Sequence, residues 1–172
     1  SYQLDIRLRL PRRLHLDLHT AHGDLVVPEM EGDLVLGGEH GDLRLAGTAG
    51  AAAVQHSHGG VHVGRVAGAF TLTAHHSSLS FDEVVGDASL NAHHGRLQLR
   101  RVGGNAVINA HHAPLEIDEI HGNAVANNHH APVHVRQVLG DLALNTHHSP
   151  VQIGAAGRVS FCQPGPRTIT HR

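Results

Sequence analysis

The sequence predicts an all-β fold, a parallel β-solenoid of about eight 18-residue coils with two strands per coil and capped ends. Three observations predict it. His-His pairs recur every 18 residues, glycine recurs with the same period, and apolar residues alternate between these markers. Because alternation with a period of two is typical of strands, each repeat is expected to consist of strands and turns.

The histidines fall into two columns when the repeats are aligned. One column, here the eight-histidine column, contains His22, His40, His58, His76, His94, His112, His130 and His148. The position before it carries the five-histidine column, which contains His75, His93, His111, His129 and His147. In stacked coils each column becomes a ladder with rungs about 4.8 Å apart.

A glycine column and a half-repeat predict the shape of each coil. Glycine occupies positions 32, 50, 68, 86, 104, 122 and 140, where we expect corner turns with positive φ. A nine-residue half-repeat is seen in Gly23-Asp24-Leu25, Gly32-Asp33-Leu34 and Gly41-Asp42-Leu43. One strand and one turn per half predict two parallel sheets packed face to face. A three-sided coil would need a six-residue pattern, and the sequence lacks one.

The elements follow one another in a single domain, expected over residues 1–172. Residues 1–20 should supply N-terminal strands or a cap, because Leu4, Ile6, Leu8 and Leu10 alternate. Residues 21–156 should form the regular coils. Residues 157–172 contain Pro164 and Pro166 and leave the period, so we expect a C-terminal cap that covers the last coil.

Composition limits the core and excludes several partners. Aromatic residues make up only 2% of the chain, so the core must be aliphatic. The 13 basic residues do not outnumber the 15 acidic ones, which argues against nucleic acid as a partner. The single cysteine, Cys162, has no second thiol to pair with. No apolar stretch approaches the ~20 residues of a membrane span.

The 20 histidines predict binding of several divalent transition-metal ions, namely zinc, copper, nickel or cobalt. Two nitrogens on one tetrahedral ion lie roughly 3.3 Å apart, so rings on neighbouring rungs would converge by tilting. Every residue of both columns is a candidate ligand. Paired columns would offer about four nitrogens from two adjacent coils, provided that both rings of a pair face the same way.

The orientation of the pair is left open by the sequence. Successive residues on a regular strand point to opposite faces. However, each pair precedes Gly, Ala or Ser and often Pro, which mark a corner where both rings could project outward. Alternatively, the eight-histidine column is a structural ladder, hydrogen-bonded to the turn backbone.

The other titratable residues are expected to be surface groups rather than catalytic ones. Four carboxylates are expected to form a solvated edge at the opposite turn, namely Asp82, Glu83, Asp118 and Glu119. Most histidines outside the two columns, His56 among them, should also lie on the surface. No nucleophile–base arrangement is present in the sequence, so we expect a protein that is not an enzyme.

The run from Leu4 to Asp24 and the repeated Gly-Asp-Leu steps resemble a bacterial domain family of unknown function that carries an adhesin label. This resemblance implies a β-solenoid and a periplasmic or extracellular location, with an export signal removed before Ser1. The family commonly has a small polar residue before Gly-Asp, whereas this chain has histidine. As an alternative to metal binding we expect an adhesive module, in which a flat polar face contacts a surface, a glycan or another copy.

Overall fold

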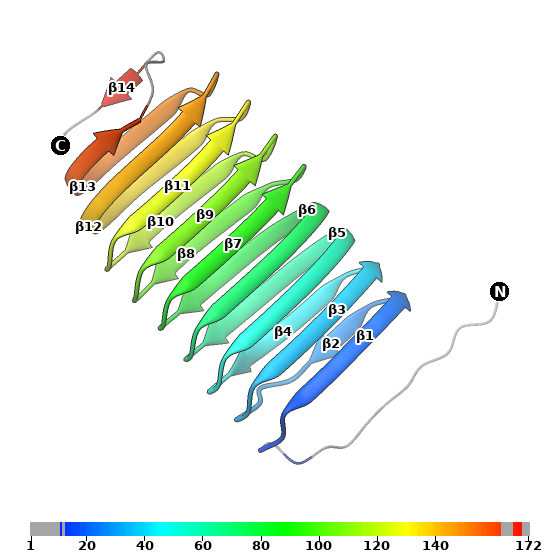
Figure 1. The fold of residues 1–172 in the computed structure, drawn as a ribbon. Coiled ribbons are helices and arrows are strands. Elements are labelled where there is room, and N and C mark those ends of the chain that lie inside the picture. The colour runs from blue at the N-terminus through cyan, green and yellow to red at the C-terminus, as the bar shows by residue number, and fades with distance from the viewer. Residues whose placement is uncertain (1–10, 12, 163–166, 170–172) are drawn as a thin grey trace.

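The computed structural model describes residues 11, 13–162 and 167–169. These residues form a parallel β-solenoid of about eight turns that recur about every 18 residues, as predicted (Figure 1). No helix in these ranges is long and apolar enough to cross a membrane. The strands are β1 (Leu16–His22), β2 (Leu25–Val27), β3 (Leu34–His40), β4 (Leu43–Thr48), β5 (Ala52–Val66), β6 (Phe70–Val84), β7 (Ala88–His93), β8 (Leu97–Val102), β9 (Ala106–His111), β10 (Leu115–Ile120), β11 (Ala124–His129), β12 (Val133–His147), β13 (Val151–Phe161) and β14 (Arg167–Ile169).

Each coil contributes one strand segment to each of two layers. The front sheet contains β1, β3, β7, β9 and β11, and the back sheet contains β2, β4, β8, β10 and β14. The longer strands β5, β6, β12 and β13 run around a corner and supply a segment to both sheets. Partners in adjacent coils are 18 residues apart, for example Ala106 and Ala124. The prediction of two strand segments per coil is therefore confirmed.

The core lies between the two sheets and is almost entirely aliphatic. In β7 the inward residues Ala88, Leu90 and Ala92 are buried, and β8 adds Leu97 and Leu99 from the opposite side. Alternate residues of both strands point outward and are more accessible. Burial of this thin layer removes apolar surface from water along the whole rod, at roughly 25 cal/mol per Å².

The corner glycines serve a different purpose from the one expected. None of the seven glycines in the predicted corner column has positive φ. Their backbones instead stack closely, because a Cβ atom at Gly86 would lie 2.6 Å from the carbonyl oxygen of Gly68. Glycine is needed here for the close approach of successive coils, and the prediction of positive φ was wrong.

The aspartates of the Gly-Asp-Leu steps link neighbouring coils. The Asp42 backbone N–H donates to Asp24 Oδ1 at 2.9 Å, and the Gly60 N–H donates to Asp42 Oδ1 at 2.9 Å. Asp87 accepts in the same way from the backbone of Asn105 at 2.7 Å. These side chains therefore satisfy backbone donors at corners where the strand ladder is interrupted.

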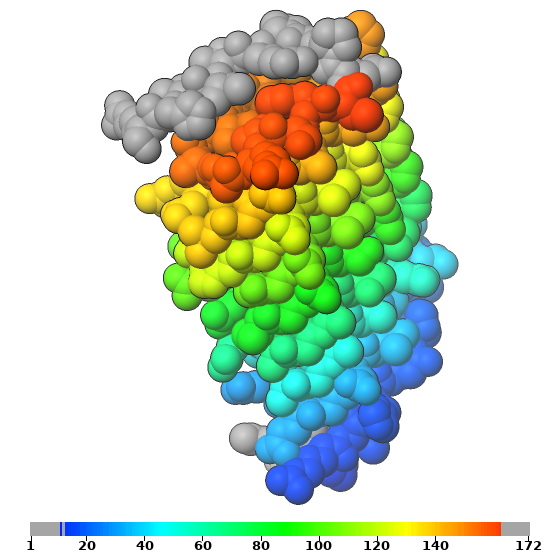
Figure 2. Space-filling model, turned by 60° about the vertical axis from the view of Figure 1, so that its left-hand side comes forward, coloured from blue at the N-terminus to red at the C-terminus, as the bar shows by residue number. Residues whose placement is uncertain are grey.

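The two ends of the rod differ in how much of them is described. At the start, the expected strand over residues 2–10 lies outside the described residues, and β1 begins at Leu16 in register with β3. At the other end, β14 pairs with β13 and covers its edge, with Arg167 opposite Val151. Their separation of 16 residues departs from the regular period. Figure 2 shows the coils stacked as successive bands along the rod.

The outward side of the back sheet carries charges of alternating sign. Glu83 lies between Arg65 at 3.1 Å and Arg101 at 3.9 Å, and Arg101 also reaches Glu119 at 3.5 Å. Arg100 contacts Asp82 at 3.4 Å. All four carboxylates expected to form a solvated edge thus lie on β6 and β10 rather than at a turn, and three of them pair with arginines of adjacent coils. Since exposed pairs contribute at most ~1 kcal/mol each, their main effect is to favour one register.

Candidate functional site

The five-histidine column lies on the outer surface of the front sheet. In β7 the inward residues are 88, 90 and 92, so strand alternation directs Ser89, Asn91 and His93 outward. His75 is exposed and the other four histidines of this column are half-buried. The expectation that this column faces outward is confirmed.

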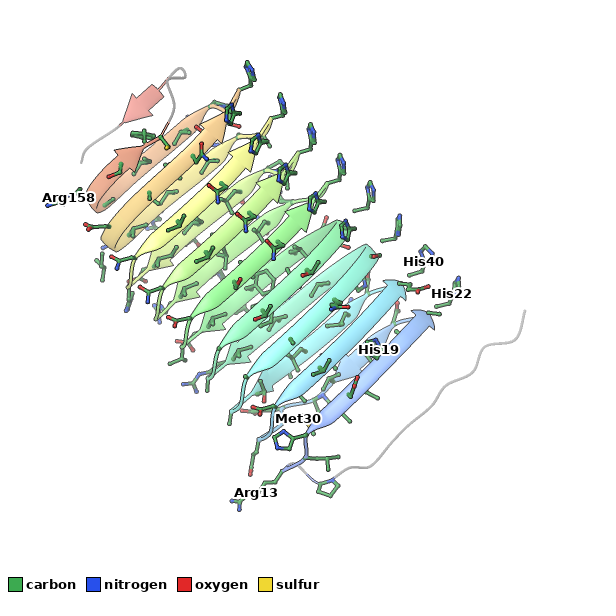
Figure 3. The ribbon with its side chains drawn as sticks, viewed as in Figure 1. Arg13, His19, His22, Met30, His40 and Arg158 are labelled. Carbon is green, nitrogen blue, oxygen red and sulfur yellow. The ribbon has the colours of Figure 1, made fainter. Side chains whose placement is uncertain are left out.

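The eight-histidine column also faces solvent, although regular alternation would turn it inward. All eight residues are exposed. From His58 to His148 their backbones are left-handed, with φ between 50° and 61°. This conformation breaks the alternation at the corner and swings the side chain away from the core. Figure 3 labels His22 and His40, whose rings project from the edge of the coil stack.

A left-handed backbone is costly for a residue with a Cβ atom. The cost is roughly 1–2 kcal/mol per residue relative to the right-handed form, although His tolerates the region better than most residues. Here the conformation recurs in six consecutive coils. It is followed by a small residue that turns inward, such as Ala113 or Ser149, which are 0% and 4% exposed.

The imidazoles of each column are stacked at the spacing of the coils. Ring centroids in the five-histidine column are 4.8–5.0 Å apart, with interplanar angles of 3–11°. The eight-histidine column has spacings of 4.9–5.4 Å. Its rings are near-parallel from His76 onward, but the first two steps are tilted by 36–38°. Rings in this column therefore tolerate a tilt without a change in spacing.

Among the residues that the structure describes, the ring nitrogens of both columns have no polar partners. Within the described part of the chain, none of these thirteen imidazoles forms a hydrogen bond or an ion pair. A structural ladder would require ring nitrogens bonded to turn backbone, and that arrangement is not present here. The corner is held instead by serines, since Ser77 Oγ donates to the carbonyl of His75 at 2.9 Å and Ser149 Oγ to that of His147 at 3.0 Å.

Beside the five-histidine column runs a ladder of asparagines that fixes the neighbouring surface. Asn109 Nδ2 donates to Asn91 Oδ1 at 2.8 Å, and Asn127 Nδ2 donates to Asn109 Oδ1 at 2.7 Å. Each amide thus bonds to the next coil, so these side chains have a defined orientation. The five-histidine column therefore lies beside a row of side chains that hydrogen bonds hold in place.

Burial and then stacking favour the neutral form of two imidazoles in the five-histidine column. The pKa values of His93 and His129 are lowered from the ordinary value of 6.5, first by partial burial and then by repulsion from the neighbouring histidines of the same column. Neutral imidazole is the form that binds metal ions. The expected lowering thus holds for these two residues, with burial as the larger cause.

The two columns do not converge on a common point. Among the residues that the structure describes, no group of three or more His, Cys, Asp or Glu side chains is close enough to hold one metal ion. The four-nitrogen shell expected from paired columns is therefore not formed in this arrangement. What each column does offer is a series of adjacent two-ring sites within one column.

One histidine outside the columns is buried, an exception to the expectation that most of these histidines lie on the surface. His56 is 3% exposed, and its Nε2 bonds to the carbonyl of Gly41 at 3.0 Å while its Nδ1 contacts Ser77 Oγ at 3.0 Å. Burial is the largest cause that lowers its pKa. A Cβ at Gly38 would lie 2.8 Å from the His56 ring, so this glycine makes room for it. Its inward position in β5, level with Ala74 of the next coil, was the sequence signal that we missed.

Other histidines form simple pairs with carboxylates. His121 Nε2 bonds to Glu119 at 2.8 Å, which lowers the pKa of that carboxyl group. His62 lies 3.6 Å from Asp82. Both carboxylates also contact an arginine of an adjacent coil, and each of these groups stands apart from the columns and adds no ligand to them.

Comparison of the chain with family models, with curated proteins and with solved structures found no match. The resemblance to adhesin-labelled bacterial domains therefore stays a prediction. The candidate site therefore consists of two stacked columns of solvent-facing imidazoles whose nitrogens have no polar partner within the described residues.

Proposed function

We propose that this chain binds and sequesters several divalent transition-metal ions, zinc or copper first, along its histidine columns. The observation that carries the proposal is the pair of stacks, of five and eight imidazoles, whose ring centroids are 4.8–5.4 Å apart and whose nitrogens have no polar partner among the described residues. Imidazole nitrogen is a preferred ligand for zinc, copper, nickel and cobalt. An accessible, neutral and unpaired ring has its lone pair free for such an ion.

The left-handed histidines support a role beyond folding. Six of them occupy a backbone region where glycine would be relaxed. Strained conformations that recur in this way are commonly found where a side chain is needed for function. Their effect in this fold is to present the imidazole to solvent.

Binding would use two rings of the same column in adjacent coils. Nitrogens that share a tetrahedral ion lie roughly 3.3 Å apart, so the two rings must tilt toward each other from their stacked positions. The proposal is supported by the steps between His22, His40 and His58, where the rings are already tilted at centroid distances of 5.0–5.1 Å. Water or further ligands would fill the remaining positions of the ion.

Acid should release the ions, because protonated imidazole has no lone pair to donate. The sites would be many and of modest affinity, which suits buffering or sequestration rather than catalysis. A periplasmic or extracellular setting is part of the proposal, and its support is the resemblance to the bacterial domain family.

An adhesive or structural module is the second candidate, and the front sheet favours it. Over coils 70–147 the outward positions of this sheet hold Thr, Ser, Asn, Val, Ala and His, with no Asp, Glu, Lys or Arg. A flat, uncharged and regular surface of this kind suits contact with another regular surface.

The two candidates are separated by measuring metal content and by calorimetric titration with zinc, copper and nickel. The untagged chain is compared with a variant in which His75, His93, His111, His129 and His147 are changed to alanine. We expect several ions per parent chain and a loss of the ions bound by this column in the variant. Less than one ion per chain, with both proteins folded, would overturn metal binding and leave the adhesive module.

A further inference from the structure

We propose that the front sheet binds a second copy of this chain, with metal ions held between the five-histidine columns of the two copies. This inference rests on the proposed function and adds a partner and a stoichiometry to it. It depends on how many ligands one chain can supply to one metal ion.

A single column leaves an ion incompletely coordinated. Zinc prefers four ligands in a tetrahedral arrangement, and adjacent rungs of one column supply two. No third His, Cys, Asp or Glu side chain lies close enough to join them in the ranges that the structure describes. The face on which these rungs stand is open to solvent, so a second face is able to approach and supply the missing pair.

The surface around the five-histidine column is suited to meet its own copy. Its fifteen outward positions carry no formal charge when histidine is neutral, so two such faces do not repel each other. The back sheet, in contrast, is covered by arginines and carboxylates that already pair with each other. Val107 and Val125 are 43% and 41% exposed and give the front sheet an apolar strip.

Twofold symmetry places one histidine column directly on the other. An axis parallel to the strands keeps the column at the same end of the strands in both copies and reverses the order of the coils. His75 and His93 of one copy then face His147 and His129 of the second copy, and His111 faces its own equivalent. Because rung spacings are 4.8–5.0 Å throughout, both pairs stay in register.

This arrangement creates two four-histidine sites in each dimer, which is one ion per chain. The Val107 residues of the two copies lie near the axis and contact each other. The eight-histidine column projects from the edge of the coil and does not take part. Loss of histidines from the five-histidine column should therefore prevent assembly, whereas loss of histidines from the eight-histidine column should not.

The area of the face indicates that assembly depends on the ions. Five coils of six-residue strands present about 24 by 20 Å, or roughly 480 Å² per copy. The total of roughly 960 Å² falls below the 1,200–2,000 Å² that stable interfaces bury. We therefore expect a monomer without metal and a dimer with it.

Sedimentation velocity of the full chain, with zinc chloride added stepwise and then removed with EDTA, tests the proposal. We expect the 18.3 kDa chain to double in mass as zinc reaches one ion per chain, and to return to a monomer with EDTA. A variant with His75, His93, His129 and His147 changed to Asn should stay monomeric. The matched variant with His76, His94, His130 and His148 changed to Asn should dimerise like the parent, since Asn tolerates the left-handed backbone.

A third variant, Val107→Arg, keeps every histidine but places two like charges at the axis. We expect it to bind zinc as the parent does and to dimerise at least tenfold more weakly. A parent chain that binds zinc and remains a monomer would overturn the dimer while leaving metal binding intact. A parent chain that binds no zinc would overturn both. Dimerisation of the variant that lacks His75, His93, His129 and His147, at the zinc concentration at which the parent dimerises, would also contradict the proposal.

Discussion

Removal of alternate rungs from the eight-histidine column should abolish metal binding by pairs of rings, whereas removal of the same number of adjacent rungs should not. The first variant changes His40, His76, His112 and His148 to Asn. Its matched control changes His22, His40, His58 and His76 to Asn and keeps four adjacent histidines. Both are made in a background whose five-histidine column is also changed to Asn, so that only one column binds.

The expected difference follows from the spacing of the rungs. Adjacent centroids are 4.9–5.4 Å apart, so alternate rungs lie about twice that distance from each other. Two nitrogens on one zinc ion are at most ~4.2 Å apart, because each bond measures about 2.1 Å. The first variant thus retains only single-ring sites. Loss of the second, pre-positioned ligand should weaken binding by about 10²–10⁴-fold, the usual gain from linking two binding groups.

Calorimetric titration with zinc at neutral pH measures this difference directly, after circular dichroism has shown that both variants keep the parent's strand content. The control keeps His94, His112, His130 and His148, so it should retain up to two sites of parental affinity per chain. Equal affinities in the two variants would refute the reasoning, because they would mean that single imidazoles bind ions without help from the neighbouring coil.

Three further predictions concern the fold. Gly86→Ala places a Cβ atom against the Gly68 carbonyl and should lower the free energy of unfolding by about 1–3 kcal/mol, measured by urea denaturation. Asn109→Ala removes two hydrogen bonds of the asparagine ladder and should cost about 1–2 kcal/mol in the same assay. In metal-free protein the pKa values of His93 and His129 are lowered in the folded state, which binds fewer protons than the unfolded chain. Stability should therefore be complete above pH ~6.5 and fall as the pH drops below it, and thermal melts that do not change between pH 7.5 and 5 would contradict this.

The architecture could be predicted from the sequence because every structural level repeats with one period. The recurrence of His76, His94 and His112 at 18-residue intervals gives the length of the coil, and alternation in segments such as Leu97 to Leu99 gives the strands. In a stacked fold each coil contacts only its neighbours, so one repeat predicts the whole rod.

The local backbone geometry was harder to predict from the sequence than the architecture. The expected positive φ at Gly86 is absent, and the left-handed residues are His58 and five of its equivalents. Sequence alone does not distinguish a glycine chosen for φ from one chosen for the close approach of a neighbouring backbone. For the same reason the orientation of the His-His pair was left open, since it depends on one torsion at the corner.

Departures from the repeat were also missed. His56 occupies a position that holds Ala74 in the next coil, and its burial depends on the space left by Gly38 and on the hydroxyl of Ser77. The arginine and carboxylate pairs on the back sheet involve residues 18 apart, such as Arg65 and Glu83. A comparison of the outward columns of the back sheet across the aligned repeats would have revealed these alternating charges.

Anomalous diffraction at the zinc absorption edge, on crystals of the zinc-loaded chain, tests the central claim most directly. We expect anomalous peaks beside the two histidine columns, each within about 2.1 Å of ring nitrogens from residues 18 apart, such as His94 and His112. Peaks confined to the carboxylate pairs of His121 and His62, or no peaks in a chain that retains the stacked columns, would contradict it.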